Sequence, residues 1–260
     1  MKVMPTSKLP PLLLLLPPLL LIDGSGERRL EPKQDAARQR LAVRDWQKTQ
    51  HSNSKMAAAA AARGLAGPRS TCLLVCDVQE RFRELVHQFD AVAATAGLLV
   101  SAARLLDVPS IATEQYPAKL GVTVPEVGIS PPDGVGAIVP VVEKVEFSMV
   151  TEGLLGQIAA AEKARSEPLR SFVLVGIETH VCVQQTCLDL LERGYDVTLV
   201  ADGLSSQRAH DRTIALELMR CAGARVTTSE AIVFELLRTS KHEKFKACSA
   251  LVKGRTHHWQ

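Results

Sequence analysis

Three residues with complementary chemistry, Asp77, Lys144 and Cys182, are candidates for one hydrolytic site. Cys182 opens a predicted helix, where unpaired backbone N–H groups and the positive end of the helix dipole favour a thiolate. The Lys144 ammonium would stabilise that anion, and the Asp77 carboxylate would accept the thiol proton and return it to a leaving amine or to water. The three side chains would therefore act as nucleophile, cation and base.

Each of these residues also has a purely structural interpretation. A free cysteine usually packs in a core as a small apolar residue, and Asp77 could cap the segment that follows it. Lys144 could be a solvated lysine that pairs with Glu143 or Glu146. Position distinguishes Cys182 from the cysteines that we interpret as core residues, which are Cys72, Cys76 and Cys187.

An alternation of apolar runs and helical patterns has to position the three candidates. The pattern predicts strands over residues 71–76, 109–113, 136–142, 171–175, 196–201 and 224–227. It predicts helices over residues 78–106, with an interruption near 89–90, and over 152–165, 182–193, 208–221 and 230–237. The strands are apolar without alternation, which indicates burial on both faces. We therefore predict a three-layer α/β/α, Rossmann-like fold with a six-stranded, mostly parallel sheet.

The ends of these strands are where a site is expected. In an open α/β sheet, ligands bind beyond the carboxyl ends of the strands. Asp77 follows the first predicted strand, Lys144 the third and Cys182 the fourth. The fold therefore brings the three candidates to one edge of the sheet.

The chain of 260 residues divides into two unlike parts. Its formal net charge of +3 is the sum of +5 over residues 1–55 and −2 over residues 56–260. A nearly neutral larger part argues against nucleic acid as a partner. We predict an N-terminal extension over residues 1–66, disordered or targeting, one domain over residues 67–253, and a tail over residues 254–260.

The extension carries an apolar run over Leu9–Ile22, which is shorter than the about 20 residues that span a bilayer. Four prolines in this run and the absence of an A-x-A site argue against a secretory signal, and acidic residues argue against a transit peptide. Six cysteines without a CxxC pair, and no N-x-S/T sequon, favour reduced thiols. We expect a cytoplasmic protein, with mitochondrial or nuclear location as the alternatives to it.

Several motifs in series resemble one known family. The chain reads CDVQERF at 76–82, TEQYP at 113–117, EKVEFSM at 143–149, VGIETHVCVQQTCLDLLERG at 175–194 and TTSEAI at 227–232. Together these segments resemble the isochorismatase-like cysteine hydrolases. The resemblance covers about residues 69–253 in order and leaves the first 66 residues outside.

The resemblance implies roles for particular residues. The Asp, Lys and Cys of the family's catalytic triad carry over onto Asp77, Lys144 and Cys182, the positions that the strand ends also indicate. The family's non-proline cis peptide would fall at Ile177–Glu178, and the backbone N–H groups of Glu178 and Cys182 would form an oxyanion hole.

The chain also departs from parts of the superfamily. Nicotinamidases bind a metal through an Asp and histidines after the second strand, whereas TEQYPAKLG contains no histidine, so we expect no catalytic metal and no cofactor. Isochorismate is not indicated as the substrate. We expect the cleft to be lined by Gln115, Tyr116, Phe147 and His180, together with Glu178.

Other enzyme classes lack their motifs. No glycine triplet completes GxGxxG after the first strand, and no GxSxG nucleophile elbow occurs. The alternative to an enzyme is an interaction module that keeps the fold without activity. We predict a metal-independent cysteine hydrolase of small amide, imide or ureide C–N bonds that acts as a homo-oligomer on a small-molecule substrate.

Overall fold

The computed structural model describes residues 64–65, 67–129 and 139–255. Most of the extension predicted over residues 1–66, and the tail beyond residue 255, lie outside this part of the chain. Six strands form one sheet in the order β3-β2-β1-β4-β5-β6, and every neighbouring pair is parallel. Their bounds are β1 (Thr71–Cys76), β2 (Ser110–Gln115), β3 (Val141–Lys144), β4 (Ser171–Ile177), β5 (Asp196–Ser205) and β6 (Arg225–Thr227).

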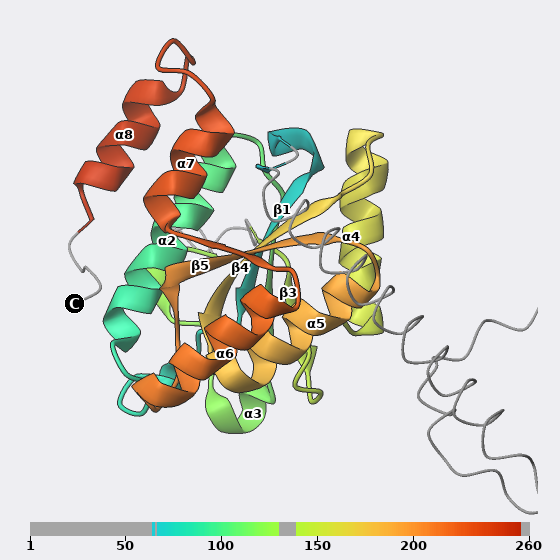
Figure 1. Ribbon diagram of the computed structural model, residues 1–260, viewed down its shortest axis with the longest axis vertical. Helices are drawn as coiled ribbons and strands as arrows, with labels where there is room; N and C mark the ends of the chain where they lie inside the picture. Colours follow the sequence, from blue (N-terminus) through green and yellow to red (C-terminus); the bar gives the residue numbers. More distant parts are fainter. Residues whose placement is uncertain (1–63, 66, 130–138, 256–260) are drawn as a thin grey trace, which may run out of the picture. The chain divides into compact units, whose positions relative to one another are not determined.

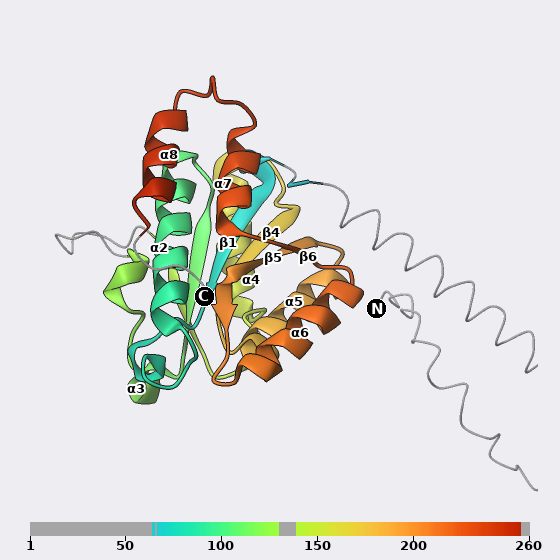
Figure 2. The ribbon, with the colours of Figure 1, turned by 60° about the vertical axis from the view of Figure 1, so that its left-hand side comes forward.

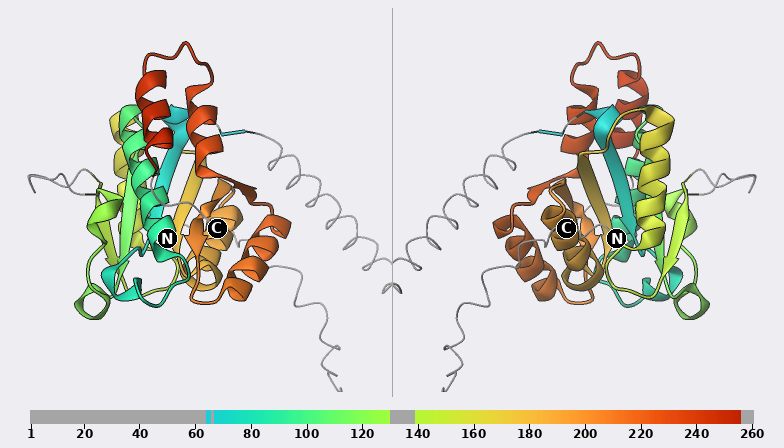
Figure 3. Two further views of the ribbon diagram at one scale, coloured as in Figure 1. Left: turned by 90° about the vertical axis from the view of Figure 1, so that its left-hand side faces the viewer. Right: turned by 90° about the vertical axis from the view of Figure 1, so that its right-hand side faces the viewer.

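Helices cover both faces of this sheet (Figure 1). One core contains buried residues of α2 (Phe89–Leu105), α7 (Ser229–Leu237) and α8 (Phe245–Lys253). The other core contains buried residues of α4 (Glu152–Arg165), α5 (Gln184–Glu192) and α6 (Ala209–Cys221). In Figure 3, α2 and α8 face the viewer in the left panel and α4 in the right panel. The predicted three-layer α/β/α fold is therefore confirmed.

Short helical turns connect several of these elements. They are η2 (Pro68–Ser70), η3 (Glu80–Phe82), α3 (Pro117–Leu120), η4 (Pro125–Val127) and the π-helical η5 (Thr179–Val183). Figure 2 shows α3 beyond the carboxyl ends of the strands. In the described part of the chain, no helix combines the length and apolar character needed to cross a membrane.

The two central strands are apolar because the sheet buries both of their faces. Every residue of β1 and every residue of β4 is buried. Such a strand needs no alternation of polar and apolar residues, which is the pattern that the sequence shows. Burial of this kind makes the carboxyl ends of β1 and β4 a rigid base for the groups that follow them.

The third predicted strand is displaced along the chain. The apolar pattern indicates residues 136–142, of which 136–138 lie outside the described part of the chain, whereas β3 runs from Val141 to Lys144. Pro140 has no N–H group and precedes the strand, with its carbonyl oxygen accepting a hydrogen bond from the Ala112 N–H. The displacement makes Lys144 the last residue of β3 and places it beside Gln115 at the end of β2.

Three helical expectations also differ from the structure. The helix expected over residues 78–106 is α-helical only in α2, because residues 78–88 contain only the short turn η3 and the left-handed Gln88 precedes Phe89. The helix expected to open at Cys182 starts as the π-helical turn η5, so Cys182 lies within the first turn and α5 begins two residues later. The helix α8 was absent from the expected elements. No side chain caps its N-terminus at Lys244, so the usual sequence signal for a helix start is missing.

Candidate active site

A cavity of about 460 Å³ opens at the carboxyl ends of the strands. Cys182 and Glu178 line this cavity. So do the four residues that were expected to bind the substrate, which are Gln115, Tyr116, Phe147 and His180. Asp77 and Lys144 are almost wholly buried beside this cavity, with 2% and 0% of their side chains exposed. The structure therefore brings the three candidate catalytic residues and the expected lining residues to one end of the sheet.

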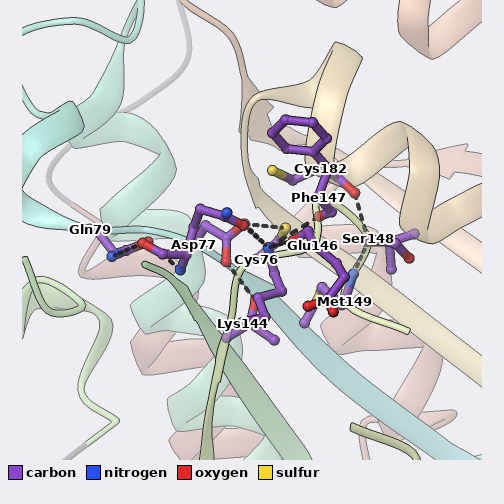
Figure 4. Close-up of polar contacts among 12 residues, drawn as sticks. Cys76, Asp77, Gln79, Lys144, Glu146, Phe147, Ser148, Met149 and Cys182 are labelled. Atoms are coloured by element: carbon purple, nitrogen blue, oxygen red, sulfur yellow. Dashed lines mark hydrogen bonds and ion pairs between the residues drawn. The ribbon is translucent and has the colours of Figure 1, made fainter. Parts of the chain in front are cut away.

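A buried ion pair joins Lys144 to Asp77. The ammonium lies 2.7 Å from Asp77 Oδ2 and also donates to Gln115 Oε1 at 2.7 Å. Two further hydrogen bonds, each 3.1 Å long, reach the carbonyl oxygens of Glu146 and Phe147 (Figure 4). A buried ion pair is stable only where its remaining polar atoms are satisfied, and these contacts meet that condition.

The Asp77 carboxylate is held on its other side by two neighbours. Thr113 Oγ1 donates to Asp77 Oδ1 at 2.7 Å, and Cys76 Sγ donates to Asp77 Oδ2 at 3.4 Å. The backbone N–H of Asp77 donates to the Thr113 carbonyl at 3.2 Å. Thr113 and Cys76 were not among the predicted site residues, although both lie in the motifs that carry the resemblance.

The charge state of Lys144 follows from this setting. Burial is the largest single influence and opposes the ammonium, but the electrostatic interactions with Cys76, Asp77 and Cys182, of which Asp77 is the charged carboxylate, together outweigh it and raise the pKa of Lys144. The residue therefore carries a positive charge at neutral pH, where it can stabilise an anion nearby. The interpretation of Lys144 as a solvated lysine does not fit a side chain that is 0% exposed.

Cys182 is positioned by the turn that contains it. Its carbonyl oxygen accepts a 2.6 Å hydrogen bond from Thr186 Oγ1, which in turn accepts from the Met149 N–H at 2.8 Å. The second contact connects the start of α5 to the segment that follows β3. Within the described residues, the Cys182 thiol makes no direct hydrogen bond to Asp77 or Lys144, although it is near enough to Lys144 to raise the pKa of the ammonium.

Three strands end in the same unusual backbone conformation. The residues that directly follow β1, β2 and β4 are Asp77, Tyr116 and Glu178, and their φ angles are 53°, 38° and 52°. Left-handed backbone is uncommon for residues other than glycine and concentrates at functional sites. The predicted cis peptide at Ile177–Glu178 is wrong, because the described part of the chain contains none. The chain instead reverses there through the left-handed Glu178.

On the β4 side of the cavity, polar groups are less completely paired. His180 Nδ1 lies 3.0 Å from Ser206 Oγ and 3.3 Å from Glu178 Oε2, while His180 Nε2 lies 3.9 Å from Asp211 Oδ2. Glu178 Oε1 and Thr179 Oγ1 are buried and have no hydrogen-bond partner in the structure as described. Buried polar atoms are usually paired, so this wall has unused capacity for hydrogen bonds.

Gln115 has a further role beyond lining the cavity. Its side-chain oxygen accepts from Lys144, and its Nε2 donates to the Val145 carbonyl at 2.8 Å. Gln115 therefore connects β2 to the segment after β3 and orients the ammonium. No group of three or more His, Cys, Asp and Glu side chains among the described residues could hold a metal ion.

Comparison with known proteins assigns the class. A sequence model of the isochorismatase domain matches residues 71–231, more than half of the chain. The protein therefore belongs to the isochorismatase family, and the resemblance read from its motifs is confirmed.

Individual relatives support this assignment. Isochorismatase domain-containing protein 2 of Xenopus laevis is 42% identical over 190 residues, which cover 73% of this chain and 86% of the relative. The MAR1 ribonuclease structure from Caenorhabditis elegans superposes with a TM-score of 0.66 at 38% identity, covering 74% of this chain and 95% of that one. The YcaC protein of Escherichia coli shares the fold, with a TM-score of 0.61 at 24% identity, 74% of this chain and 90% of that chain.

Proposed function

We propose that this protein is a metal-independent cysteine hydrolase that cleaves a C–N bond of a small amide, imide or ureide. One observation supports the proposal most strongly: a thiol that lines a cavity, Cys182, lies next to a buried and fully hydrogen-bonded Asp77–Lys144 pair. A thiol, a base and a fixed cation are the groups that covalent hydrolysis of a carbonyl compound requires.

The reaction follows from these positions. The Cys182 proton passes to Asp77, and the thiolate attacks the carbonyl carbon while the C=O π electrons move onto oxygen. The backbone N–H groups of Glu178 and Cys182 hold that oxyanion, and Lys144 balances the negative charge of the site. The C–N bond then breaks as Asp77 returns the proton to the leaving nitrogen. Water then adds to the thioester carbon as one of its protons passes to Asp77, the C–S bond breaks to release the carboxylic acid, and Asp77 returns the proton to the Cys182 thiolate.

The cavity favours a small substrate with N–H donors. A volume of about 460 Å³ accommodates a small molecule, and the exposed rings of Tyr116 and Phe147 lie at its edge. Glu178 Oε1 is an acceptor that lacks a donor. An amide or ureide nitrogen would supply that donor. The remaining charged residues of the lining are of both signs, with Asp211 opposed by Lys119 and Arg208, so the preference for an N–H group rests on Glu178.

The alternative is an interaction module without activity. The complete pairing of Asp77 and Lys144 would then be structural only, and Cys182 would be no more reactive than other thiols. The nearby Cys187 is the reference thiol, since burial raises its pKa to about 12 and keeps it protonated at neutral pH. Cys221 is the exposed reference.

The decisive experiment measures thiol reactivity and turnover in the same variants. Iodoacetamide at pH 7, read out by peptide mass spectrometry, should modify Cys182 faster than Cys187 or Cys221. With a library of small amides, imides and ureides, Cys182→Ala should reduce turnover by about 10³-fold or more, and Lys144→Ala and Asp77→Ala should also abolish most of it. Equal labelling of the three thiols together with no turnover would leave the interaction module as the explanation.

Two further arms test the remaining parts of the proposal. A chelator of divalent ions should leave turnover unchanged, and a loss of activity that added metal restores would contradict metal independence. A short RNA should remain intact, since the ribonuclease name belongs to the worm relative and the larger part of this chain carries a net charge of −2.

The homo-oligomer also stays a proposal. Ile214 and Leu218 on α6 are 50% and 43% exposed and lie one helical turn apart. The bacterial YcaC protein is described as an octameric hydrolase of unknown specificity. Light scattering of the intact protein, with Leu218→Lys as the variant, tests whether this face of α6 joins subunits; a monomer in both samples would contradict the proposal.

A further inference from the structure

Cys76, the last residue of β1, touches both partners of the proposed proton transfer. It is 0% exposed, and its Sγ donates to Asp77 Oδ2 at 3.4 Å. Its side chain also neighbours that of Cys182, which after burial is the largest influence that raises the pKa of Cys76. Figure 4 shows the two sulfur atoms on the same side of the cluster that contains Asp77 and Lys144. The apolar run around Cys76 predicts a core residue, which accounts for its burial but not for these contacts.

The close packing of β1 against β4 keeps Cys76 in this position. Cys76 is paired in register with Gly176 of β4. A Cβ atom added to Gly176 would lie 2.1 Å from the Cys76 carbonyl oxygen and 2.7 Å from the Cys76 Cβ. The absence of a side chain at residue 176 is therefore what lets Cys76 lie at the strand end next to the segment that leads to Cys182.

The charges around Lys144 decide which groups are ionised. One ammonium faces three groups that can carry a negative charge: Asp77, Cys76 and Cys182. Burial, followed by the neighbouring Cys182 side chain and the charge of Asp77, raises the pKa of Cys76 well above its usual value. Cys76 therefore keeps its proton at neutral pH and serves as a hydrogen-bond donor to an anion.

We propose that Cys76 is a positioning residue whose S–H donates to Asp77 before the proton transfer and to the Cys182 thiolate after it. The proposal rests on the function proposed above. When the Cys182 proton passes to Asp77, the negative charge moves from the carboxylate to the sulfur. Rotation about the Cys76 Cβ–Sγ bond moves only the thiol hydrogen and redirects the donor to the new anion. Cys76 gives up no proton, and no bond to its sulfur forms or breaks.

The test uses the pH dependence of Cys182 alkylation in the full-length protein. Iodoacetamide is the probe, and peptide mass spectrometry gives the rate at Cys182 from pH 5 to pH 10. Removal of the donor in Cys76→Ala should raise the pH of half-maximal reaction by about one unit, a tenfold loss of thiolate at a given pH. Cys76→Ser, which keeps a donor, should return most of this shift.

Matched variants separate this role from packing. Cys72 lies on the same strand and the same face, is equally buried, and donates only weakly to the Leu73 carbonyl at 3.7 Å. Cys72→Ala should leave the pH profile unchanged. Cys76→Val lacks the donor but nearly keeps the volume, so it replaces Cys76→Ala if the smaller side chain prevents folding.

The outcomes are distinct from those of the functional proposal. The donor role would be overturned if the pH profile of Cys182 alkylation in Cys76→Ala or Cys76→Val equalled that of the protein without substitutions. A shift in Cys76→Ser as large as in Cys76→Ala would also overturn it. Neither measurement depends on turnover, so an inactive protein with a displaced profile would contradict the hydrolase and still support the role of Cys76.

Discussion

The two sides of the candidate site differ in how completely their polar groups are paired. On the side formed by β1, β2 and β3, the Asp77 carboxylate and the Lys144 ammonium have partners at 2.7 Å and are almost fully buried. On the β4 side, Glu178 Oε1 and Thr179 Oγ1 are buried without partners in the described structure. The first side is complete without a ligand, and the second is not.

Under the proposed function, the first side would carry out the chemistry and the second would recognise the substrate. A satisfied ion pair keeps its geometry with any substrate, which suits a group that sets charge and moves a proton. An acceptor without a donor stabilises the fold little but gains a hydrogen bond when a matching group enters. We therefore expect substitutions on the Asp77–Lys144 side to change mainly the stability of the fold. Substitutions on the β4 side should change mainly the selectivity for substrates.

The largest effect on stability is expected for the buried pair. Lys144→Met leaves the Asp77 charge buried without its cation, which should lower the free energy of unfolding by about 3–5 kcal/mol in urea titrations. Arg69→Ala removes an exposed ion pair with Glu167 and should cost less than about 1 kcal/mol. Equal losses of unfolding free energy in the two variants would show that the buried Asp77–Lys144 pair contributes no more to stability than an exposed ion pair does.

A smaller loss is expected where β4 passes β1. Gly176 has a φ of 140°, and an added Cβ would meet the Cys76 carbonyl oxygen. Gly176→Ala should therefore lower the free energy of unfolding by about 3 kcal/mol, from backbone strain and overpacking together. Gly156, in α4 with open space around it, is the control, and Gly156→Ala should raise stability by up to about 1 kcal/mol. A stable Gly176→Ala would contradict the tight approach.

The smallest change in stability is expected for Glu178→Met. This substitution removes the unpaired acceptor Oε1 together with Oε2, which lies 3.3 Å from His180 Nδ1, so a gain and a loss offset each other and the free energy of unfolding should change by less than about 1 kcal/mol. Selectivity should change more. We expect Cys182 to react faster with acrylamide than with N,N-dimethylacrylamide, which lacks N–H donors, and the ratio of the two rates to fall about tenfold in the variant. A constant ratio would remove Glu178 from substrate recognition.

Much of the fold was predictable because local patterns decided it. The bounds of β1 and α4 match the predicted ranges 71–76 and 152–165. An unbroken apolar run indicates a buried strand, and Thr151 before α4 accepts a hydrogen bond from the Leu154 N–H as a helix cap. The bounds of β3 were harder to predict from the sequence. Val139 is apolar and buried like a strand residue, but it lies before Pro140 and outside the strand.

The site was predictable only in part. Asp77, Lys144 and Cys182 could be found because strand ends in a parallel sheet meet at one edge. The contacts of Cys76 could not, since a cysteine inside an apolar run looks the same whether it packs in a core or faces a carboxylate. The unpaired state of Glu178 Oε1 likewise depends on neighbours from distant segments.

The sequence by itself determined the layered fold, the family and the three residues proposed for catalysis, because periodicity, composition and motif order are local properties of the chain. The tertiary structure alone decided how these residues are paired. The left-handed turns at Asp77, Tyr116 and Glu178, the approach of Cys76 to Cys182, and the unmatched acceptor on the β4 side all arise where strands distant in sequence end together. Hydrogen-bond satisfaction is set by such non-local neighbours.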